Sequence, residues 1–134
     1  MHKFVRNLLT EWRKLKLPFA DETIIIAVSG GADSVSLMLA LHNLKTHKKI
    51  NLRFIIANFD HDLRGIKSRN DTEFVRKLSA DLDFEFITET AKSKIQHQQG
   101  NLEQNARNAR YTFLSQTAEK HKAFAILTGH TQND

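Results

Sequence analysis

The sequence of 134 residues contains no cysteine, one proline and five glycines. The absence of cysteine excludes disulfides, a thiolate nucleophile and cysteine-ligated zinc from this stretch. The low proline and glycine content excludes a collagenous or low-complexity chain, and 40% hydrophobic residues suffice for one domain with a core. No apolar run approaches the roughly 20 residues that cross a bilayer. We therefore expect a soluble, cytoplasmic protein with no membrane partner.

The formal net charge of +5 suits a polyanionic partner, although many basic proteins of this size bind no nucleic acid. Part of this charge lies in residues 2–17, where apolar side chains recur at helical spacing with basic ones between them. This pattern predicts an amphipathic helix within residues 1–20 that ends near Pro18. We expect its basic face to be solvated, and a surface that contacts RNA is the alternative.

Short apolar runs predict four strands, at residues 23–29, 52–59, 84–89 and 123–128. Apolar residues at helical spacing predict helices between them, over 35–44, 74–82 and 101–121, with a polar loop at 60–70. Strands that alternate with helices predict an α/β fold, here a Rossmann-like three-layer domain with a parallel sheet that ends after its fourth strand. Ligands of such sheets bind where the strand order reverses, so the residues after the first and fourth strands should lie together.

The segment SGGADS follows the first predicted strand and precedes a helix, where main-chain N–H groups and the helix dipole favour an anion. Paired glycines let a phosphate approach the main chain, and serine hydroxyls can donate hydrogen bonds to its oxygens. A tight turn followed by a helix cap would need no ligand and is the alternative. The candidate nucleotide-binding residues are Ser29, Gly30, Gly31, Ala32, Asp33 and Ser34.

Asp33 is unusual in this setting, because a carboxylate beside phosphate oxygens is repelled unless a cation lies between them. The segment therefore predicts Mg²⁺ together with a polyphosphate. SGGxDS after a buried strand also resembles the signature of the PP-loop enzymes, or N-type ATP pyrophosphatases, which share the HUP fold of the adenine nucleotide alpha hydrolases. This resemblance implies that ATP is cleaved between its α- and β-phosphates, that AMP passes to a substrate oxygen, and that pyrophosphate is released.

Three further segments resemble one branch of that family, the tRNA(Ile)-lysidine synthases. Residues 58–65 (NFDHDLRG) look like the motif H-V-(D/N)-H-x-L-R-G, with Asn58 in place of the usual histidine. Asp60, His61 and Arg64 match the motif, which implies contacts with substrate or nucleotide. An Asx-type turn with a solvated imidazole is the alternative for Asp60 and His61.

Residues 101–111 (NLEQNARNARY) are similar to the second motif, N-L-E-x-x-A-R-x-x-R-Y. Arg107 and Arg110 are three residues apart on one helix face and could clamp phosphate or carboxylate oxygens. An exposed ion pair between Glu103 and Arg107 is the alternative.

Residues 128–134 (TGHTQND) look like the start of the third motif, (A/G)-H-x-x-D-D-Q-x-E-T, with Asn133 at its first aspartate. His130 could contact phosphate oxygens, and Asp134 could hold Mg²⁺ or the incoming amine. A polar tail is the alternative. The resemblance thus implies two metal ligands, Asp33 and Asp134, and a catalytic set of Asp33, Arg107, Arg110, His130 and Asp134.

By this resemblance, residues 1–134 are part of a PP-loop catalytic domain, with the rest of that domain and the tRNA-binding domains outside them. ATP would activate the C2 oxygen of the wobble cytidine in the CAU anticodon of tRNA(Ile), and free L-lysine would displace AMP. We expect residues 1–134 alone to be inactive, and their sequence leaves the oligomeric state open. The alternatives are a PP-loop tRNA 2-thiolation enzyme and a non-catalytic nucleotide-binding module of the universal-stress type.

Overall fold

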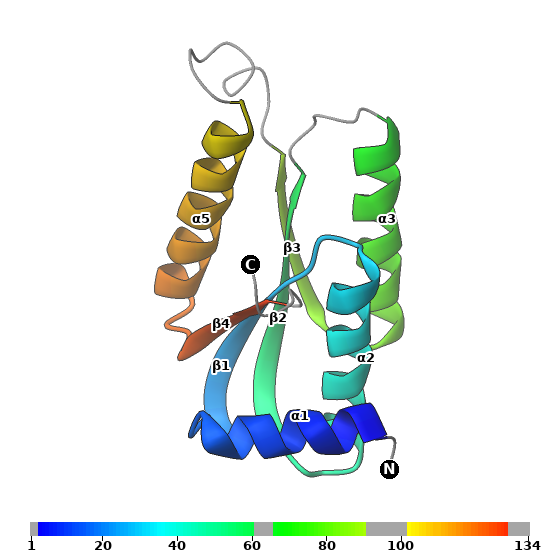
Figure 1. The fold of residues 1–134 in the computed structure, drawn as a ribbon, viewed down its shortest axis with the longest axis vertical. Helices are drawn as coiled ribbons and strands as arrows, with labels where there is room; N and C mark the ends of the chain where they lie inside the picture. The colour runs from blue at the N-terminus through cyan, green and yellow to red at the C-terminus, as the bar shows by residue number, and fades with distance from the viewer. Residues whose placement is uncertain (1–2, 61–65, 91–101, 129–134) are drawn as a thin grey trace.

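The computed structural model describes residues 3–60, 66–90 and 102–128, with side chains for 6–60, 69–90 and 104–128 (Figure 1). Strands and helices alternate along the chain: α1 (Lys3–Lys14), β1 (Ala20–Ala27), α2 (Ala32–Thr46), β2 (Asn51–Asp60), α3 (Ile66–Asp81), β3 (Glu85–Thr90), α5 (Leu102–Lys120) and β4 (Ala125–Thr128). Within these ranges, no helix is both long and apolar enough to span a membrane.

The four strands form one parallel sheet in the order β3-β2-β1-β4. The chain moves outward from β1 to β2 and β3 and then returns to the other side of β1 with β4. The strand order therefore reverses between β1 and β4, whose carboxyl ends are neighbours because Ala27 pairs with Thr128. This arrangement confirms the predicted Rossmann-like α/β fold and puts its switch point at the end of β1.

Helices cover both faces of the sheet, because β1 is apolar on both sides. Ile24 and Ile26 pack into the core beneath α1, α2 and α3, whereas Ile25 and Ala27 belong to a second core cluster with Phe113 and Leu114 of α5. Figure 1 shows α5 on one side of the sheet, α2 and α3 on the other, and α1 across the amino ends of the strands. Burial of consecutive isoleucines on both faces is what a central parallel strand requires.

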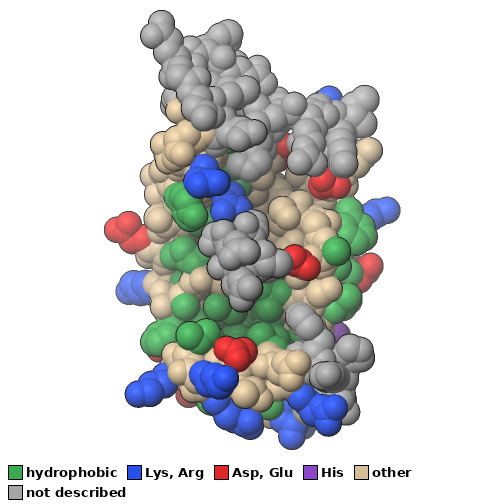
Figure 2. Space-filling view, in the orientation of Figure 1, with side chains coloured by type: hydrophobic (Ala, Val, Ile, Leu, Met, Phe, Trp, Pro, Cys, Tyr) green, Lys and Arg blue, Asp and Glu red, His purple; other side chains and the backbone are tan. Residues whose placement is uncertain are grey.

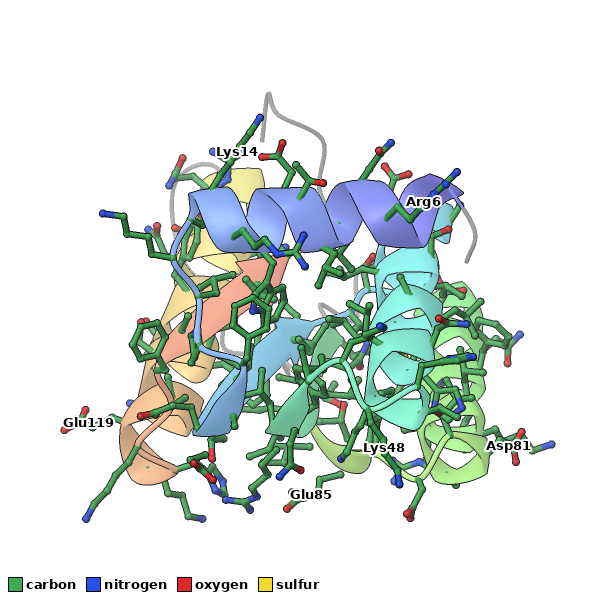
Figure 3. All side chains as sticks on the ribbon, turned by 90° about the horizontal axis from the view of Figure 1, so that it is seen from below. Arg6, Lys14, Lys48, Asp81, Glu85 and Glu119 are labelled. Atoms are coloured by element: carbon green, nitrogen blue, oxygen red, sulfur yellow. The ribbon has the colours of Figure 1, made fainter. Side chains whose placement is uncertain are left out.

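The N-terminal helix is amphipathic, as predicted, and it ends at Lys14 rather than near Pro18. Its buried face includes Leu9 and Trp12, and the indole Nε1 of Trp12 donates a hydrogen bond to the carbonyl of Pro18 at 2.8 Å. Seen from below, Arg6 and Lys14 point away from the body of the protein (Figure 3). The helix therefore closes one end of the core and presents basic side chains outside it.

Two further predicted boundaries were wrong. The polar stretch 60–70 is not a loop throughout, because Asp60 ends β2 and α3 already begins at Ile66. Between Ile66 and Phe74 the sequence of α3 is entirely polar, so it gives no helical periodicity there. Similarly, β1 begins at Ala20 rather than Thr23. The apolar pattern missed the first residues of this strand because they are exposed, and their register with β2 is irregular.

Candidate functional site

The predicted phosphate-binding segment joins β1 to α2 at the carboxyl edge of the sheet. After β1 ends, Val28 still donates its N–H to the carbonyl of Ala57 at 3.0 Å, and α2 begins at Ala32. Figure 1 shows this short connection leaving the end of β1 and turning into α2. Residues 29–34, which we call the SGGADS loop, thus lie at the switch point predicted to bind a ligand.

Two serine hydroxyls hold the turn together from inside. The Oγ of Ser29 accepts a hydrogen bond from the N–H of Gly31 at 3.2 Å, and the Oγ of Ser34 donates one to the carbonyl of Gly31 at 3.1 Å. The two Oγ atoms lie 3.4 Å apart. Ser34 is buried and Ser29 is exposed, so Ser34 supports the turn and the hydroxyl of Ser29 could donate a hydrogen bond to a ligand.

The N-terminus of α2 carries no side-chain cap. Its N-cap residue, Gly31, has extended φ and ψ angles of −73° and 164° and no side chain that could accept a hydrogen bond. The first N–H groups of a helix lack partners within the helix, and they lie at the positive end of its dipole. Asp33 lies exposed in this first turn. A phosphate could therefore accept hydrogen bonds here, with a cation needed between it and the Asp33 carboxylate.

Gly30 brings the loop against α3. Its φ of +101° lies in the region that favours glycine, and a Cβ at this position would lie 3.1 Å from the Cβ of Asp71 and 3.6 Å from its carboxyl carbon. Asp71 was not predicted from the sequence, because the stretch before it was interpreted as a loop. In the sequence, Asp71 is one of several polar residues before the predicted helix, and its position beside Gly30 depends on the tertiary fold.

Asp60 is the last residue of β2, buried with 6% of its surface exposed, and it pairs with Thr90 of β3. The structure thus places it at the carboxyl edge of the sheet, on the strand next to the one that leads into the SGGADS loop. Its motif partners His61 and Arg64 lie outside the described residues.

Arg107 and Arg110 lie near the start of α5, on the opposite face of the sheet from α2 (Figure 1). Arg107 is exposed, and the guanidinium carbon of Arg110 lies 5.5 Å from the centre of the Tyr111 ring. This is the range of a cation–π interaction, which orients a guanidinium without neutralising it. The alternative pairing of Arg107 with Glu103 lies outside the described side chains.

The third predicted motif falls after the last described strand residue, Thr128. His130 and Asp134 therefore lie outside the described residues, and only the strand that precedes them is seen beside β1. Among the described side chains, no group of three histidine, aspartate or glutamate residues could hold a metal ion. Asp33 is thus the one predicted metal ligand whose surroundings are visible.

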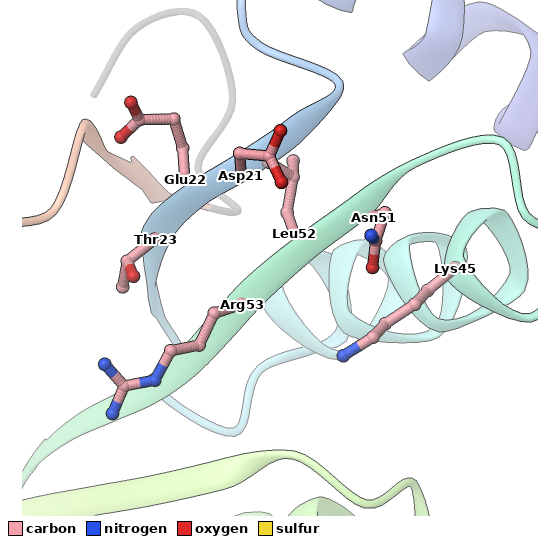
Figure 4. A pocket seen from close by; sticks show the side chains of 7 residues that line it. All are labelled: Asp21, Glu22, Thr23, Lys45, Asn51, Leu52 and Arg53. Atoms are coloured by element: carbon pink, nitrogen blue, oxygen red, sulfur yellow. The ribbon is translucent and has the colours of Figure 1, made fainter.

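The shallow pocket in Figure 4 lies at the opposite, amino edge of the sheet and contains none of the predicted site residues; its lining is Asp21, Glu22, Thr23, Lys45, Asn51, Leu52 and Arg53. Arg53, which lines the pocket, donates two hydrogen bonds of 2.6 Å to the carboxylate of Glu85. This interaction lowers the pKa of Glu85 and raises that of Arg53. The pocket mixes both signs of charge and lacks a glycine turn, so it does not suit a polyphosphate.

Basic side chains also gather at this end of the molecule. Figure 2 shows Lys and Arg side chains along its lower end, where α1 crosses. Arg6, Arg13 and Lys14 of α1 are exposed there, as is Lys48 after α2. The basic face expected for the N-terminal helix is therefore exposed at the edge away from the SGGADS loop.

The sequence matches known proteins over nearly all of its length. The family described as the PP-loop domain matches residues 2–134. The tRNA(Ile)-lysidine synthase of Thermus thermophilus is 41% identical over 124 residues, which cover 91% of this chain and 23% of that protein. The tRNA(Ile)-lysidine synthase of Clostridioides difficile is 35% identical over 130 residues, 96% of this chain and 28% of that protein. The chain thus spans about a quarter of the length of these relatives.

Two solved structures share the fold at low sequence identity. The U34-tRNA thiolase NcsA from Methanococcus maripaludis has a TM-score of 0.76 and 16% identity, covering 96% of this chain and 45% of the thiolase. The NAD⁺ synthetase from Burkholderia pseudomallei has a TM-score of 0.54 and 18% identity, covering 95% of this chain and 60% of the synthetase. At such identities, the two structures support the α/β architecture alone.

Proposed function

Because this chain belongs to the PP-loop domain family, we propose that it forms the ATP-binding part of an enzyme that adenylates a tRNA. The observation that carries the proposal is the SGGADS loop, which leaves the central buried strand at the switch point and enters a helix whose N-terminus has no side-chain cap. This arrangement offers main-chain N–H groups and a dipole to the phosphates of a nucleotide.

The loop suits the release of pyrophosphate in particular. An oxygen of the substrate attacks the α-phosphorus of ATP, the bond between the α- and β-phosphates breaks, and the bridging oxygen leaves with pyrophosphate. Negative charge grows on the leaving group in this step, and fixed N–H dipoles stabilise such charge without having to reorganise. Ser29 adds a hydroxyl donor at the exposed side of the turn.

The residues of the loop also fit Mg²⁺, which proteins bind through one or two carboxylates together with substrate phosphates. Asp33 would supply one carboxylate from the first turn of α2, and Asp134 is proposed to supply the other. When bound, the ion would offset the charge of the phosphates. Two protein carboxylates together with the phosphates would suffice for such a site.

We propose the remaining steps from the resemblance of the three motifs to the tRNA(Ile)-lysidine synthases, the name that the relatives carry. The attacking oxygen is then the C2 oxygen of the wobble cytidine of a CAU anticodon, and the ε-amine of free L-lysine attacks C2 and displaces AMP. In this scheme Arg107, Arg110 and His130 contact phosphate oxygens, and Asp60, His61 and Arg64 contact the nucleotide or the tRNA. Such an enzyme would work in the cytoplasm.

The test uses the complete protein with ATP, Mg²⁺, labelled lysine and two tRNAs that differ only at the wobble cytidine. We expect pyrophosphate release and lysine incorporation with the CAU anticodon and neither with its counterpart. A product that forms without lysine and needs a sulfur donor would identify a thiolation enzyme instead. ATP binding without pyrophosphate release on any tRNA would identify a non-catalytic nucleotide-binding module.

A further inference from the structure

A buried amide lies directly behind the SGGADS loop. Asn58 of β2 is 2% exposed, and its Nδ2 donates a hydrogen bond to the carbonyl of Val28 at 2.9 Å. Its Oδ1 accepts hydrogen bonds from the hydroxyls of Thr72 and Thr88, each at 3.0 Å. The reverse amide orientation would set two carbonyl oxygens against each other at Val28, so these partners fix which atom is nitrogen.

The bond to Val28 holds the start of the loop. Val28 is the residue before Ser29, and its N–H is already bound to the carbonyl of Ala57 at 3.0 Å. Asn58 adds a hydrogen bond to the carbonyl of the same residue. The last peptide groups before the turn are therefore tied to β2 by a main-chain bond and a side-chain bond.

The bond to Thr72 holds the other side of the loop, through α3. Thr72 is buried in α3 and directly follows Asp71, whose Cβ lies 3.1 Å from the position that a Cβ on Gly30 would take. The hydrogen bond from Thr72 to Asn58 thus sets how closely α3 approaches the loop. The third partner, Thr88, lies on β3, on the far side of β2 from β1.

We propose that Asn58 is a positioning residue for the SGGADS loop, which it holds at Val28 directly and at Gly30 through Thr72 and Asp71. This inference rests on the proposed function, in which the loop holds the phosphates of ATP. Asn58 touches no substrate in this scheme. It fixes the distance between the loop and α3, and a shift of about 1 Å in a catalytic geometry can cost about a hundredfold in rate.

The experiment compares Thr72→Val with Thr88→Val in the complete protein, because both remove a 3.0 Å hydrogen bond to the same oxygen atom. Only Thr72 lies next to the residue that contacts the loop. We expect Thr72→Val to raise the KM for ATP in pyrophosphate release about tenfold, and Thr88→Val to leave it within about twofold, since a single hydrogen bond is worth up to about one factor of ten. Ser79→Ala controls for the loss of a buried hydroxyl elsewhere on α3, where Ser79 donates to the carbonyl of Val75 at 2.8 Å.

A second readout needs no ATP, namely hydrogen exchange of the amides of residues 29–34. We expect faster exchange there in Thr72→Val than in Thr88→Val or Ser79→Ala. Equal exchange and equal KM values in the two threonine variants would overturn the positioning role. If the exchange rates differ as expected but the wild type releases no pyrophosphate with any tRNA, the proposed function is wrong. The positioning of the loop by Asn58 through Thr72 is then still supported.

Asn58→His provides a rescue test for the loss expected in Asn58→Leu. One ring nitrogen can donate to the carbonyl of Val28 while the other accepts from one threonine, so we expect a KM for ATP closer to wild type than that of Asn58→Leu. The triple variant Asn58→Leu/Thr72→Val/Thr88→Val removes both sides of the hydroxyl bonds and should regain stability lost in Asn58→Leu. A regained stability with a wild-type KM for ATP would also overturn the proposal.

Discussion

Replacing Gly30 by alanine tests the geometry of the SGGADS loop most directly. Gly30 has a φ of +101°, and an added Cβ would lie 3.1 Å from the Cβ of Asp71 and 3.5 Å from its carbonyl oxygen. A side chain in this backbone region costs about 1 to 3 kcal/mol. The close contact adds to this cost, because the Cβ and the carbonyl oxygen of Asp71 are fixed by the main chain of α3 and cannot rotate away. We therefore expect Gly30→Ala to destabilise the end of β1 and the start of α2 by at least about 1 kcal/mol.

Gly31→Ala is the matched control, since it adds the same methyl group one residue later. Gly31 has a φ of −73°, which any residue adopts, and its added Cβ would meet only the Oγ of Ser29 at 3.5 Å. Because alanine is a poorer N-cap than glycine, we expect a loss below about 1 kcal/mol. Both variants should bind ATP more weakly, since both methyl groups stand where a phosphate approaches the main chain.

Hydrogen exchange of the amides in β1 and α2 of the complete protein measures these local stabilities. The variant Asp71→Gly separates the two causes, because it removes the contact and leaves the backbone strain. We expect Gly30→Ala to cost less in that background but still more than Gly31→Ala. Equal and small losses for Gly30→Ala and Gly31→Ala would refute the left-handed backbone at Gly30, and strict additivity with Asp71→Gly would refute the contact.

Three further predictions concern the metal, the extent of the chain and pH. Asp33→Ala should abolish pyrophosphate release and remove the dependence of ATP binding on Mg²⁺, which titrations with and without the metal would measure; activity that survives would contradict its role as a ligand. Residues 1–134 alone should incorporate no labelled lysine into tRNA, and incorporation at a rate comparable to the complete protein would show that the catalytic machinery lies within them. Arg53 lowers the pKa of Glu85 below its ordinary value of 4.5, so the stabilisation from this exposed pair should be present above about pH 4.5 and lost as the pH falls through the lowered value. Comparing acid unfolding of the wild type and Glu85→Gln measures this effect, which should be small because both side chains are about half exposed, 47% for Arg53 and 50% for Glu85.

The sequence predicted the sheet well because its strands are buried on both faces. The isoleucines of β1 form a continuous apolar run, and such runs separated by helical periodicity leave few folds other than a parallel α/β sheet. That the first and fourth strands lie side by side was expected from the general rule for ligand sites in such sheets, and the order β3-β2-β1-β4 confirms it. The strand order itself depends on tertiary packing and could not be derived from local patterns.

The prediction failed where a helix begins with polar residues. Between Ile66 and Phe74 the sequence of α3 is entirely polar, and a polar stretch after a strand is interpreted most simply as a loop. This error hid Asp71, although its own side chain lies against the most constrained glycine of the loop. A helix can place polar residues near a ligand at the carboxyl edge, yet periodicity detects only the part of a helix with regularly spaced apolar residues.

Asn58 was hidden for a different reason, because its importance depends on three partners from three separate elements. In the sequence it is a departure from a motif, a polar residue near the end of an apolar strand. In the structure its amide matches its surroundings, with a donor toward the carbonyl of Val28 and an acceptor shared by two threonine hydroxyls. A histidine at the same position has one donor and one acceptor nitrogen when neutral, so it could satisfy Val28 and only one threonine. Asparagine at position 58 is therefore compatible with the geometry of the loop. Where a relative has histidine at this position, we expect one of the two threonines, Thr72 or Thr88, to be replaced as well.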